Sequence, residues 1–176
     1  NYPSAYELDN LVTVAASTQA DNLVSSSNFG VHSVDLAAPG ELVPTTTLED
    51  DYAISNGTSI ATPHVAGALA LYRTLEPELS HTTLIKRLLG TTDAVESLEG
   101  LVASAGRLNI GRLINLSPCT EDQFGYDCAS CTCIHGTCDS GLEGNGECSE
   151  CEEGWAGPDC TRCASNFFGV TDDTSS

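Results

Sequence analysis

All nine cysteines of this 176-residue chain lie between residues 119 and 163, and residues 1–118 contain none. The cysteine-rich segment is short and has few large aliphatic side chains, so disulfides are expected to stabilise it in place of an apolar core. The preceding part is rich in Val, Leu, Ile and Ala and can contribute to a packed core. We therefore expect a domain over residues 1–116 and a disulfide-rich module over residues 119–163.

The first domain contains alternating strand and helix patterns. Apolar runs of strand length occur at residues 11–16 and 34–38, and short runs of this kind are typical of parallel strands buried on both faces. Residues 59–75 are small or apolar on every side, which predicts a buried helix. Residues 80–90 place leucines at helical spacing after Ser80, a favourable N-cap. This alternation predicts an α/β fold.

Acidic side chains outnumber basic ones by 25 to 6, which gives a net charge of −19. The chain has no cluster of Lys and Arg, so we expect no binding to nucleic acid. The acidity could serve cationic substrates or calcium, but solubility is the simpler interpretation. No cofactor is expected, and no calcium site is identified although the parent protein could carry one.

Neither a membrane span nor a targeting segment is expected within these residues. No apolar run reaches the roughly 20 residues that span a bilayer. The chain does not begin with Met, so we interpret it as an internal piece whose targeting segment lies upstream. Dense cysteines indicate an oxidising compartment, and the protein is therefore expected to be secreted or held on the extracellular face of a membrane.

The most informative stretch, residues 56–67, reads N-G-T-S-I-A-T-P-H-V-A-G. Gly57 permits a tight turn, and Ser59 then lies at the start of a helix, where unpaired N–H groups and a partial positive charge occur. A serine hydroxyl there can attack a carbonyl while the N–H of the same residue stabilises the resulting oxyanion. The alternative for an isolated serine is a simple N-cap.

This stretch closely resembles the nucleophile motif of subtilisin-like serine proteases, the subtilases, which reads G-T-S-M-A-T-P-H-V-A-G. The segments V-D-L-A-A-P-G at residues 34–40 and G-R-L-N at residues 106–109 are also similar to family segments and occur in the family's order. The resemblance covers residues 1–116. It implies the C-terminal part of a subtilisin-like parallel-sheet domain, incomplete as a catalytic domain.

The resemblance also implies roles for individual residues. Ser59 would be the catalytic nucleophile and, through its backbone N–H, one oxyanion donor; Tyr2 and Pro3 would line the substrate pocket. The family's Asp and His segments and its second oxyanion donor do not occur in this sequence. His64 is no substitute, because five helical residues place it about 140° around the helix from Ser59. We expect these residues to be inactive alone, although the parent is a serine endopeptidase acting on polypeptides.

The cysteine module resembles epidermal-growth-factor (EGF)-like repeats of laminin or stabilin type. The resemblance rests on C-I-H-G-T-C at residues 133–138 and G-W-A-G-P-D-C at residues 154–160. The stretches that begin at Cys119 and Cys163 are alike, so residues 164–176 are interpreted as the truncated start of a further repeat or as a disordered tail. The implied disulfides are Cys119–Cys128, Cys131–Cys138, Cys133–Cys148 and Cys151–Cys160, with Cys163 unpaired.

Two alternatives stay open at this point. Three C-x2-C pairs and His135 could bind zinc in a cytosolic protein. The parent could instead be an extracellular adhesion or receptor protein, with an inert protease fold and EGF-like repeats that bind a protein ligand. Intact D-x-G and H-G-T-H segments upstream would favour the enzyme. Asn56 also begins an N-G-T sequon, which we expect to be buried beside Ser59 and unmodified.

Overall fold

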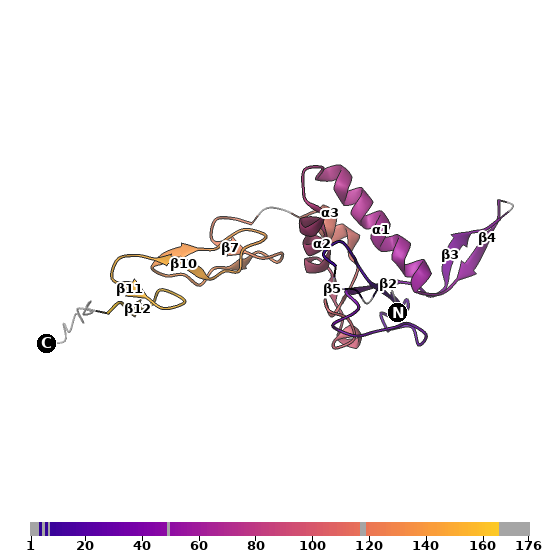
Figure 1. Cartoon of the computed structure of the whole chain (residues 1–176), viewed down its shortest axis with the longest axis horizontal. Helices are drawn as coiled ribbons and strands as arrows, with labels where there is room; N and C mark the ends of the chain where they lie inside the picture. Colours follow the sequence, from indigo (N-terminus) through magenta and orange to yellow (C-terminus); the bar gives the residue numbers. More distant parts are fainter. Residues whose placement is uncertain (1–3, 5, 7, 49, 117–118, 166–176) are drawn as a thin grey trace. The chain divides into compact units, whose positions relative to one another are not determined.

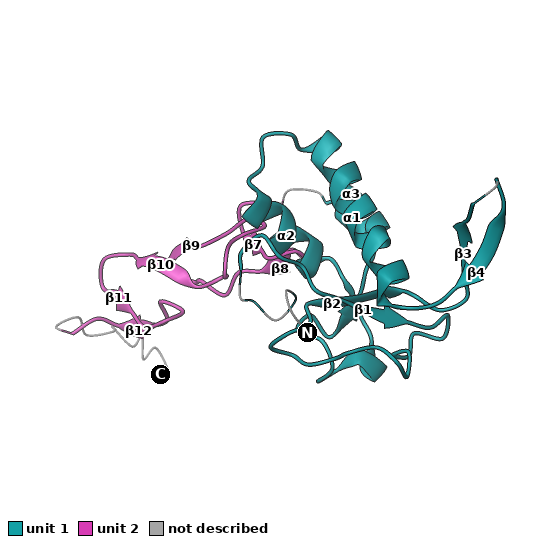
Figure 2. Ribbon diagram, turned by 45° about the vertical axis from the view of Figure 1, so that its right-hand side comes forward, with its two compact units in different colours: residues 1–116 teal, residues 117–176 magenta. Residues whose placement is uncertain are grey.

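The computed structural model describes residues 4, 6, 8–48, 50–116 and 119–165. It divides the chain into two compact units, residues 1–116 (unit 1) and residues 117–176 (unit 2) (Figures 1 and 2). Unit 1 contains the strands β1 Val14–Ser17, β2 Leu36–Pro39, β3 Val43–Thr46, β4 Tyr52–Ser55, β5 Asp93–Ala94 and β6 Gly106–Arg107. It also contains the helices α1 Thr58–Leu75, α2 His81–Gly90 and α3 Ile110–Ile114, and a 3-10 turn at Glu96–Leu98.

Four of these strands form one sheet in the order β1-β2-β6-β5. β1 pairs in parallel with β2, β2 in parallel with β6, and β5 is antiparallel to β6. The predicted α/β character and parallel pairing are therefore confirmed, although each strand starts two or three residues later than its apolar run. β1 lies at an edge of this sheet, and α1 crosses one face.

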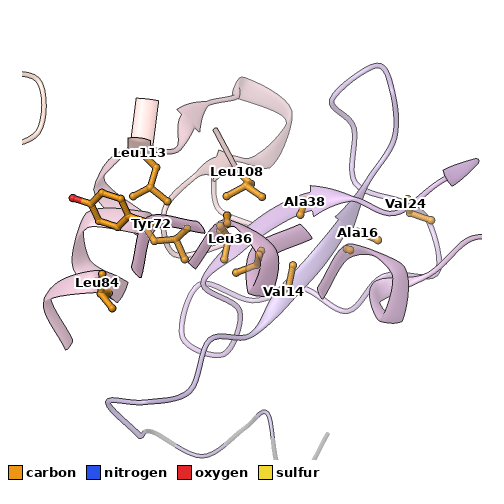
Figure 3. Close-up of a cluster of buried hydrophobic side chains, with 13 residues drawn as sticks. Val14, Ala16, Val24, Leu36, Ala38, Tyr72, Leu84, Leu108 and Leu113 are labelled. Carbon is orange, nitrogen blue, oxygen red and sulfur yellow. The ribbon is translucent and has the colours of Figure 1, made fainter. Parts of the chain in front are cut away.

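The first two strands send alternate side chains to opposite faces of the sheet, as strand geometry requires. On one face, side chains from both strands contact buried residues of α1 and the C-terminal part of unit 1 (Figure 3); they are Val14, Ala16, Leu36 and Ala38. The other face packs Ala15 and Ala37 against Val34, Leu98 and Val102. Four of the six strand residues are alanine, so the covering elements can approach the backbone closely.

Only one side of α1 is buried, which corrects the prediction of a helix buried all round. The buried residues recur every three or four positions; they are Ala61, Val65, Ala68 and Tyr72. The opposite side is exposed although it is also small or apolar, and it includes Leu71 at 45% exposure and Leu75 at 54%. Composition predicted burial here because it does not show which side has a neighbour.

α2 begins and packs as its sequence predicts. The Ser80 hydroxyl accepts a hydrogen bond from the Thr83 amide at 3.1 Å, which satisfies one of the unpaired donors of the first turn. Leu84 and Leu88 are buried against the core. Gly90 is the last helical residue, and Thr91 occupies the C-cap position.

A polar junction joins β5, β6 and α3. Arg107 donates to Asp93 at 2.9 Å and also bonds to Asp21, far away in sequence. Asn109 donates to the other oxygen of Asp93 at 2.8 Å, and it caps α3 through the Arg112 amide. The hydrogen bond from Asn109, partly offset by burial and helped by Arg107, holds the pKa of Asp93 below its ordinary value.

The depressed pKa of Asp93 makes part of the stability of unit 1 dependent on pH. Since the folded pKa lies below the unfolded one, the contribution is present above about pH 4 and lost as pH falls through the folded value. We expect Asp93→Asn to lower the free energy of unfolding by about 1–3 kcal/mol at pH 7. The deficit should shrink below pH 4 in denaturant titrations, and Glu96→Gln, an exposed control, should show neither effect.

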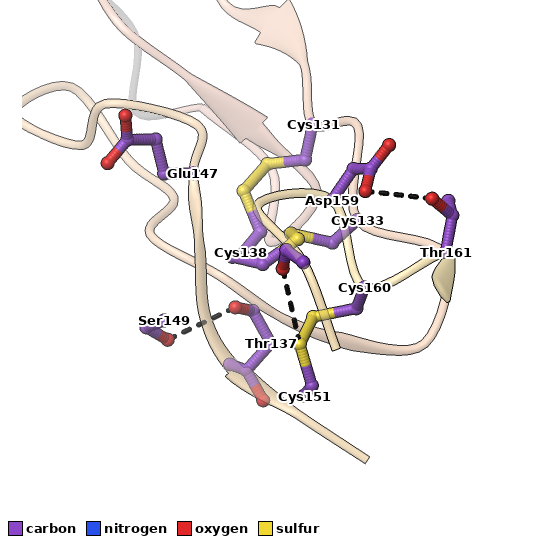
Figure 4. Close-up of a disulfide and its surroundings, with 12 residues drawn as sticks. Cys131, Cys133, Thr137, Cys138, Glu147, Ser149, Cys151, Asp159, Cys160 and Thr161 are labelled. Carbon is purple, nitrogen blue, oxygen red and sulfur yellow. Dashed lines mark hydrogen bonds between the residues drawn. A yellow bond between two sulfur atoms is a disulfide. The ribbon is translucent and has the colours of Figure 1, made fainter. Parts of the chain in front are cut away.

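Unit 2 is a chain of short hairpins cross-linked by disulfides. Its strands are β7 Gln123–Phe124, β8 Ala129–Ser130, β9 Gly136–Cys138, β10 Cys148–Cys151, β11 Trp155–Ala156 and β12 Arg162–Cys163. The disulfides join Cys119 to Cys128, Cys131 to Cys138, Cys133 to Cys148, and Cys151 to Cys160; Figure 4 shows the Cys131–Cys138 and Cys151–Cys160 links. These are the pairs that the EGF-like resemblance implies, and they leave Cys163 as the one cysteine of the described residues with a free thiol for metal binding.

Close backbone approach in unit 2 depends on glycine. A Cβ atom at Gly136 would lie 2.4 Å from the Glu150 carbonyl oxygen and 2.7 Å from the Cys160 sulfur. Beside it, the His135 ring stacks on Trp155 with centroids 3.6 Å apart. Gly136 therefore lies directly against the Cys151–Cys160 disulfide, and the preceding histidine stacks on the tryptophan.

Removing one disulfide should destabilise unit 2 measurably. The Cys133–Cys148 link closes a loop with a sequence separation of 15, for which chain-entropy arguments predict about 3 kcal/mol. We expect Cys133→Ser/Cys148→Ser to lower the free energy of unfolding by about that amount. Trp155, the single tryptophan of the chain, reports this transition by fluorescence. Replacing the free, exposed Cys163 with serine is the matched control and should change little.

Candidate functional site

The candidate site begins where β2 ends, at Gly40. The Gly40 amide donates to the Ser17 carbonyl at 3.0 Å, and its carbonyl accepts from the Gly57 amide at 2.7 Å. A Cβ atom at Gly40 would lie 2.6 Å from the Ala16 Cβ and 2.9 Å from the Gly57 carbonyl oxygen. Gly40 therefore lets the end of β1 and the start of α1 meet at one point.

Gly57 is the N-cap of α1. Its φ of 134° and ψ of 167° lie in a region that side-chain-bearing residues rarely adopt. Its carbonyl accepts from the amides of Ile60 at 3.0 Å and Ala61 at 3.2 Å. These bonds start the helix, so that Thr58 and Ser59 become its first two residues.

Ser59 is exposed at this helix start. Among the residues that the structure describes, nothing accepts from its amide, and its hydroxyl has no hydrogen-bond partner. Pro63, four residues later, has no amide hydrogen to donate to the Ser59 carbonyl. The free N–H groups of a helix N-terminus carry partial positive charge. Ser59 thus combines an accessible hydroxyl with an amide suited to stabilise an oxyanion.

The histidines of unit 1 have other environments. The His64 Nδ1 lies 3.0 Å from the Ile60 carbonyl oxygen, one turn back along α1, so the ring is directed along its own helix. His32 and His81 are exposed. Asp35 accepts from the Thr13 amide at 2.7 Å, which ties the approaches to β1 and β2 together. Within the described part of unit 1, no imidazole hydrogen-bonds to Ser59.

A hollow of about 230 Å³ lies between the edge strand β1 and the first turns of α1. It is lined by Ser4, Val12, Thr13, Val14, Asn28, Ser33, Val34, Thr58 and Thr62. The two helical threonines flank the turn that carries Ser59. Tyr2 and Pro3, predicted to line a substrate pocket, lie outside the described residues.

Sequence reasoning missed two parts of this arrangement. The A-P-G segment was noted, but the role of Gly40 depends on Ala16, which is distant in sequence. Asn56 was expected to be buried and is exposed; its Oδ1 accepts from the Leu42 amide at 2.6 Å. The positive φ of Leu42, 55°, lets the chain turn there. Asn56 thereby ties together the two ends of the segment that joins Gly40 to α1.

Comparison with known families agrees with this geometry. Residues 1–113 match the model of the subtilase family, which is well over half of the chain. The chain belongs to the subtilase family. Among related subtilases, Subtilisin BL of Lederbergia lenta is 39% identical over 97 residues, which are 55% of this chain and 35% of that protein. Subtilisin-like protease 1 of Plasmodium falciparum (isolate 3D7) is 34% identical over 114 residues, which cover 62% and 17% of the two chains.

Solved structures of other proteins are similar to unit 1. The A subunit of an AB5 toxin from E. coli is similar with a TM-score of 0.59 at 29% identity; the match covers 64% of this chain and 42% of that one. The epidermin leader peptide processing serine protease of Staphylococcus aureus gives a TM-score of 0.57 at 29% identity, covering 65% and 32%. This subtilase chain therefore spans about a third or less of the curated relatives named here and under half of these structures.

Two other features are absent from the described residues. None of their helices is both long and apolar enough to cross a bilayer. They also contain no group of three or more His, Cys, Asp and Glu side chains suited to hold a metal ion.

Proposed function

We propose that the protein containing this chain is a serine endopeptidase and that Ser59 is its nucleophile. The observation that carries the proposal is the exposed Ser59 hydroxyl at the start of α1, beside its own unpaired amide. The subtilisin-type proteases among its relatives support polypeptides as the substrate class. The chemistry that this geometry permits is acyl transfer.

In this reaction, the Ser59 Oγ attacks the carbonyl carbon of the scissile peptide bond, and its proton passes to a base. The carbonyl electron pair moves onto the oxygen, where the Ser59 amide stabilises the charge. Collapse of this intermediate breaks the C–N bond, and the amine leaves with a proton from the base. Water then hydrolyses the acyl-enzyme, which restores the hydroxyl.

The described part of unit 1 brings no base to Ser59. No imidazole of the described unit 1 meets Ser59, and without a base serine is a weak nucleophile. We expect the 176-residue chain alone to hydrolyse casein no faster than its Ser59→Ala variant, in a fluorescence-release assay at matched concentration. Hydrolysis that disappears with this substitution would contradict the expectation.

A fluorophosphonate probe tests the proposal on the full-length protein. The probe should label the parent protein, and peptide mapping should place the adduct on Ser59. Ser59→Ala should remain unlabelled while keeping the parent's thermal unfolding profile. An unlabelled parent protein that is folded would instead favour an inert protease fold in an adhesion or receptor protein.

We further propose that the protein is secreted or displayed on the outside of a cell. Four disulfides within residues 119–160 are typical of oxidising compartments. The cysteine-rich unit, with its EGF-like spacing, would act as a spacer or as a docking surface for an extracellular protein ligand. Mapping thiols in the protein isolated from its native source would test this, since reduced cysteines throughout unit 2 would contradict it.

A further inference from the structure

The segment between Gly40 and α1 is a two-stranded antiparallel ribbon, β3–β4. Val43 pairs with Ser55, Pro44 with Ile54, Thr45 with Ala53, and Thr46 with Tyr52. In both Figures 1 and 2 the ribbon extends away from α1 and from the sheet. Its sequence did not predict a strand, because Pro44 cannot donate a ladder hydrogen bond.

One face of this ribbon is apolar and exposed. Along β3, exposed residues alternate with half-buried ones, and pairing places Pro44 and Thr46 on the same face as Ile54 and Tyr52. Tyr52 is 73% exposed and Ile54 58%. We call Pro44, Tyr52 and Ile54 the ribbon face. Contiguous apolar exposure of this kind marks an interaction surface.

Acidic groups lie at the turn end of the ribbon face. Asp50 and Asp51 are both exposed. The Asp51 carboxylate accepts from the Tyr52 amide at 2.8 Å, so it is held at the backbone where β4 begins. The ribbon face therefore suits a partner that has both apolar and positively charged side chains.

The other end of the ribbon leads directly to the nucleophile. Only Asn56, Gly57 and Thr58 separate β4 from Ser59, and the Asn56–Leu42 hydrogen bond fixes the base of the ribbon. A strand of four residues extends over about 13 Å. A polypeptide bound at Ser59 can therefore continue along the ribbon with a few extended residues.

We propose that the ribbon face is an exosite that binds an extended segment of the substrate polypeptide, beyond the residues next to the scissile bond. The segment carries apolar side chains for Tyr52 and Ile54, and Lys or Arg for the acidic turn. This inference rests on the proposed protease function. It predicts that long unfolded substrates gain affinity from contacts that a small active-site probe does not make.

The test uses the full-length protein, with β-casein as a long substrate and a fluorophosphonate as a small probe. For Tyr52→Ser/Ile54→Ser we expect kcat/KM on casein to fall about tenfold or more, mainly through KM. The rate of fluorophosphonate labelling should stay within about twofold of the parent protein, which also shows that the variant is folded. Ile134→Ser, which removes an exposed apolar side chain from unit 2, is the matched control.

A second double substitution tests the acidic turn. Asp50→Asn/Asp51→Asn should slow cleavage of native casein, and it should have little effect on casein whose lysines are acetylated. If the Tyr52→Ser/Ile54→Ser variant is labelled normally and cleaves casein at the parent rate, the exosite is overturned while the proposed protease function stands. Absent labelling of Ser59 in the parent protein removes the proposed function together with it. A third outcome is that the parent protein is a dimer, that the ribbon substitutions dissociate it, and that casein cleavage is unchanged. That result would assign the ribbon face to contact with a second copy of the chain and overturn the exosite.

Discussion

Replacing Ser59 with alanine is expected to reduce peptide hydrolysis by the full-length protein by about 10⁴- to 10⁶-fold. The substitution removes the only atom that can form the acyl-enzyme, while the amide that stabilises the oxyanion stays in place. The residual rate would come from that amide and from substrate binding. Initial-rate measurements on a fluorogenic protein substrate would show the loss.

The same substitution should leave the fold intact. The Ser59 hydroxyl has no partner among the described residues, and alanine is favourable in a helix. The free energy of unfolding is therefore expected to change by less than about 0.5 kcal/mol. Thr74→Ala, at the far end of α1, is the control for removing a hydroxyl from this helix and should retain activity. A Ser59→Ala protein that keeps more than a tenth of its activity would contradict the assignment.

The second large effect is expected at Gly40, which does not take part in the chemistry. A methyl group there would overlap the Ala16 side chain and the Gly57 carbonyl oxygen, and backbone atoms cannot move aside cheaply. We expect Gly40→Ala to cost about 1–3 kcal/mol of stability. Because it displaces Gly57, and with it the start of α1, we also expect about a 10²-fold loss of kcat.

Two further variants distinguish displacement of the start of α1 from a general loss of stability. Gly111→Ala, in α3, should keep activity because alanine is favoured over glycine within a helix. Ala16→Gly in the Gly40→Ala background should recover part of the lost kcat, since it removes one of the two overlaps. Equal loss of kcat with and without Ala16→Gly would show that the contact with Ala16 is not the cause.

Local patterns in the sequence predicted the local structure well. The helix after Gly57, the Ser80 cap and the two apolar strands follow from spacing and residue type over a few positions. The serine at a helix start also follows from local sequence. The shared property of these features is that the residues which determine them are close together along the chain.

Features that depend on distant residues could not be predicted in this way. To predict the bond from Arg107 to Asp21, or the close approach of Gly40 to Ala16, one must know which strands are neighbours. The β3–β4 ribbon was missed because Pro44 weakens the strand pattern. The exposed side of α1 was missed because its residues are as small and apolar as those on the buried side. In each case tertiary context, and not local propensity, decides the outcome.

The anchoring of α1 at its far end limits how much its direction can vary. Tyr72 is buried, and its hydroxyl accepts from Arg87 of α2 at 3.0 Å. Ser59 lies 13 residues before Tyr72, about 20 Å along the helix, so a rotation of only about 3° about that anchor would shift Ser59 by about 1 Å. The position of the reacting oxygen is thus set partly by a tyrosine–arginine contact between three and four helical turns away.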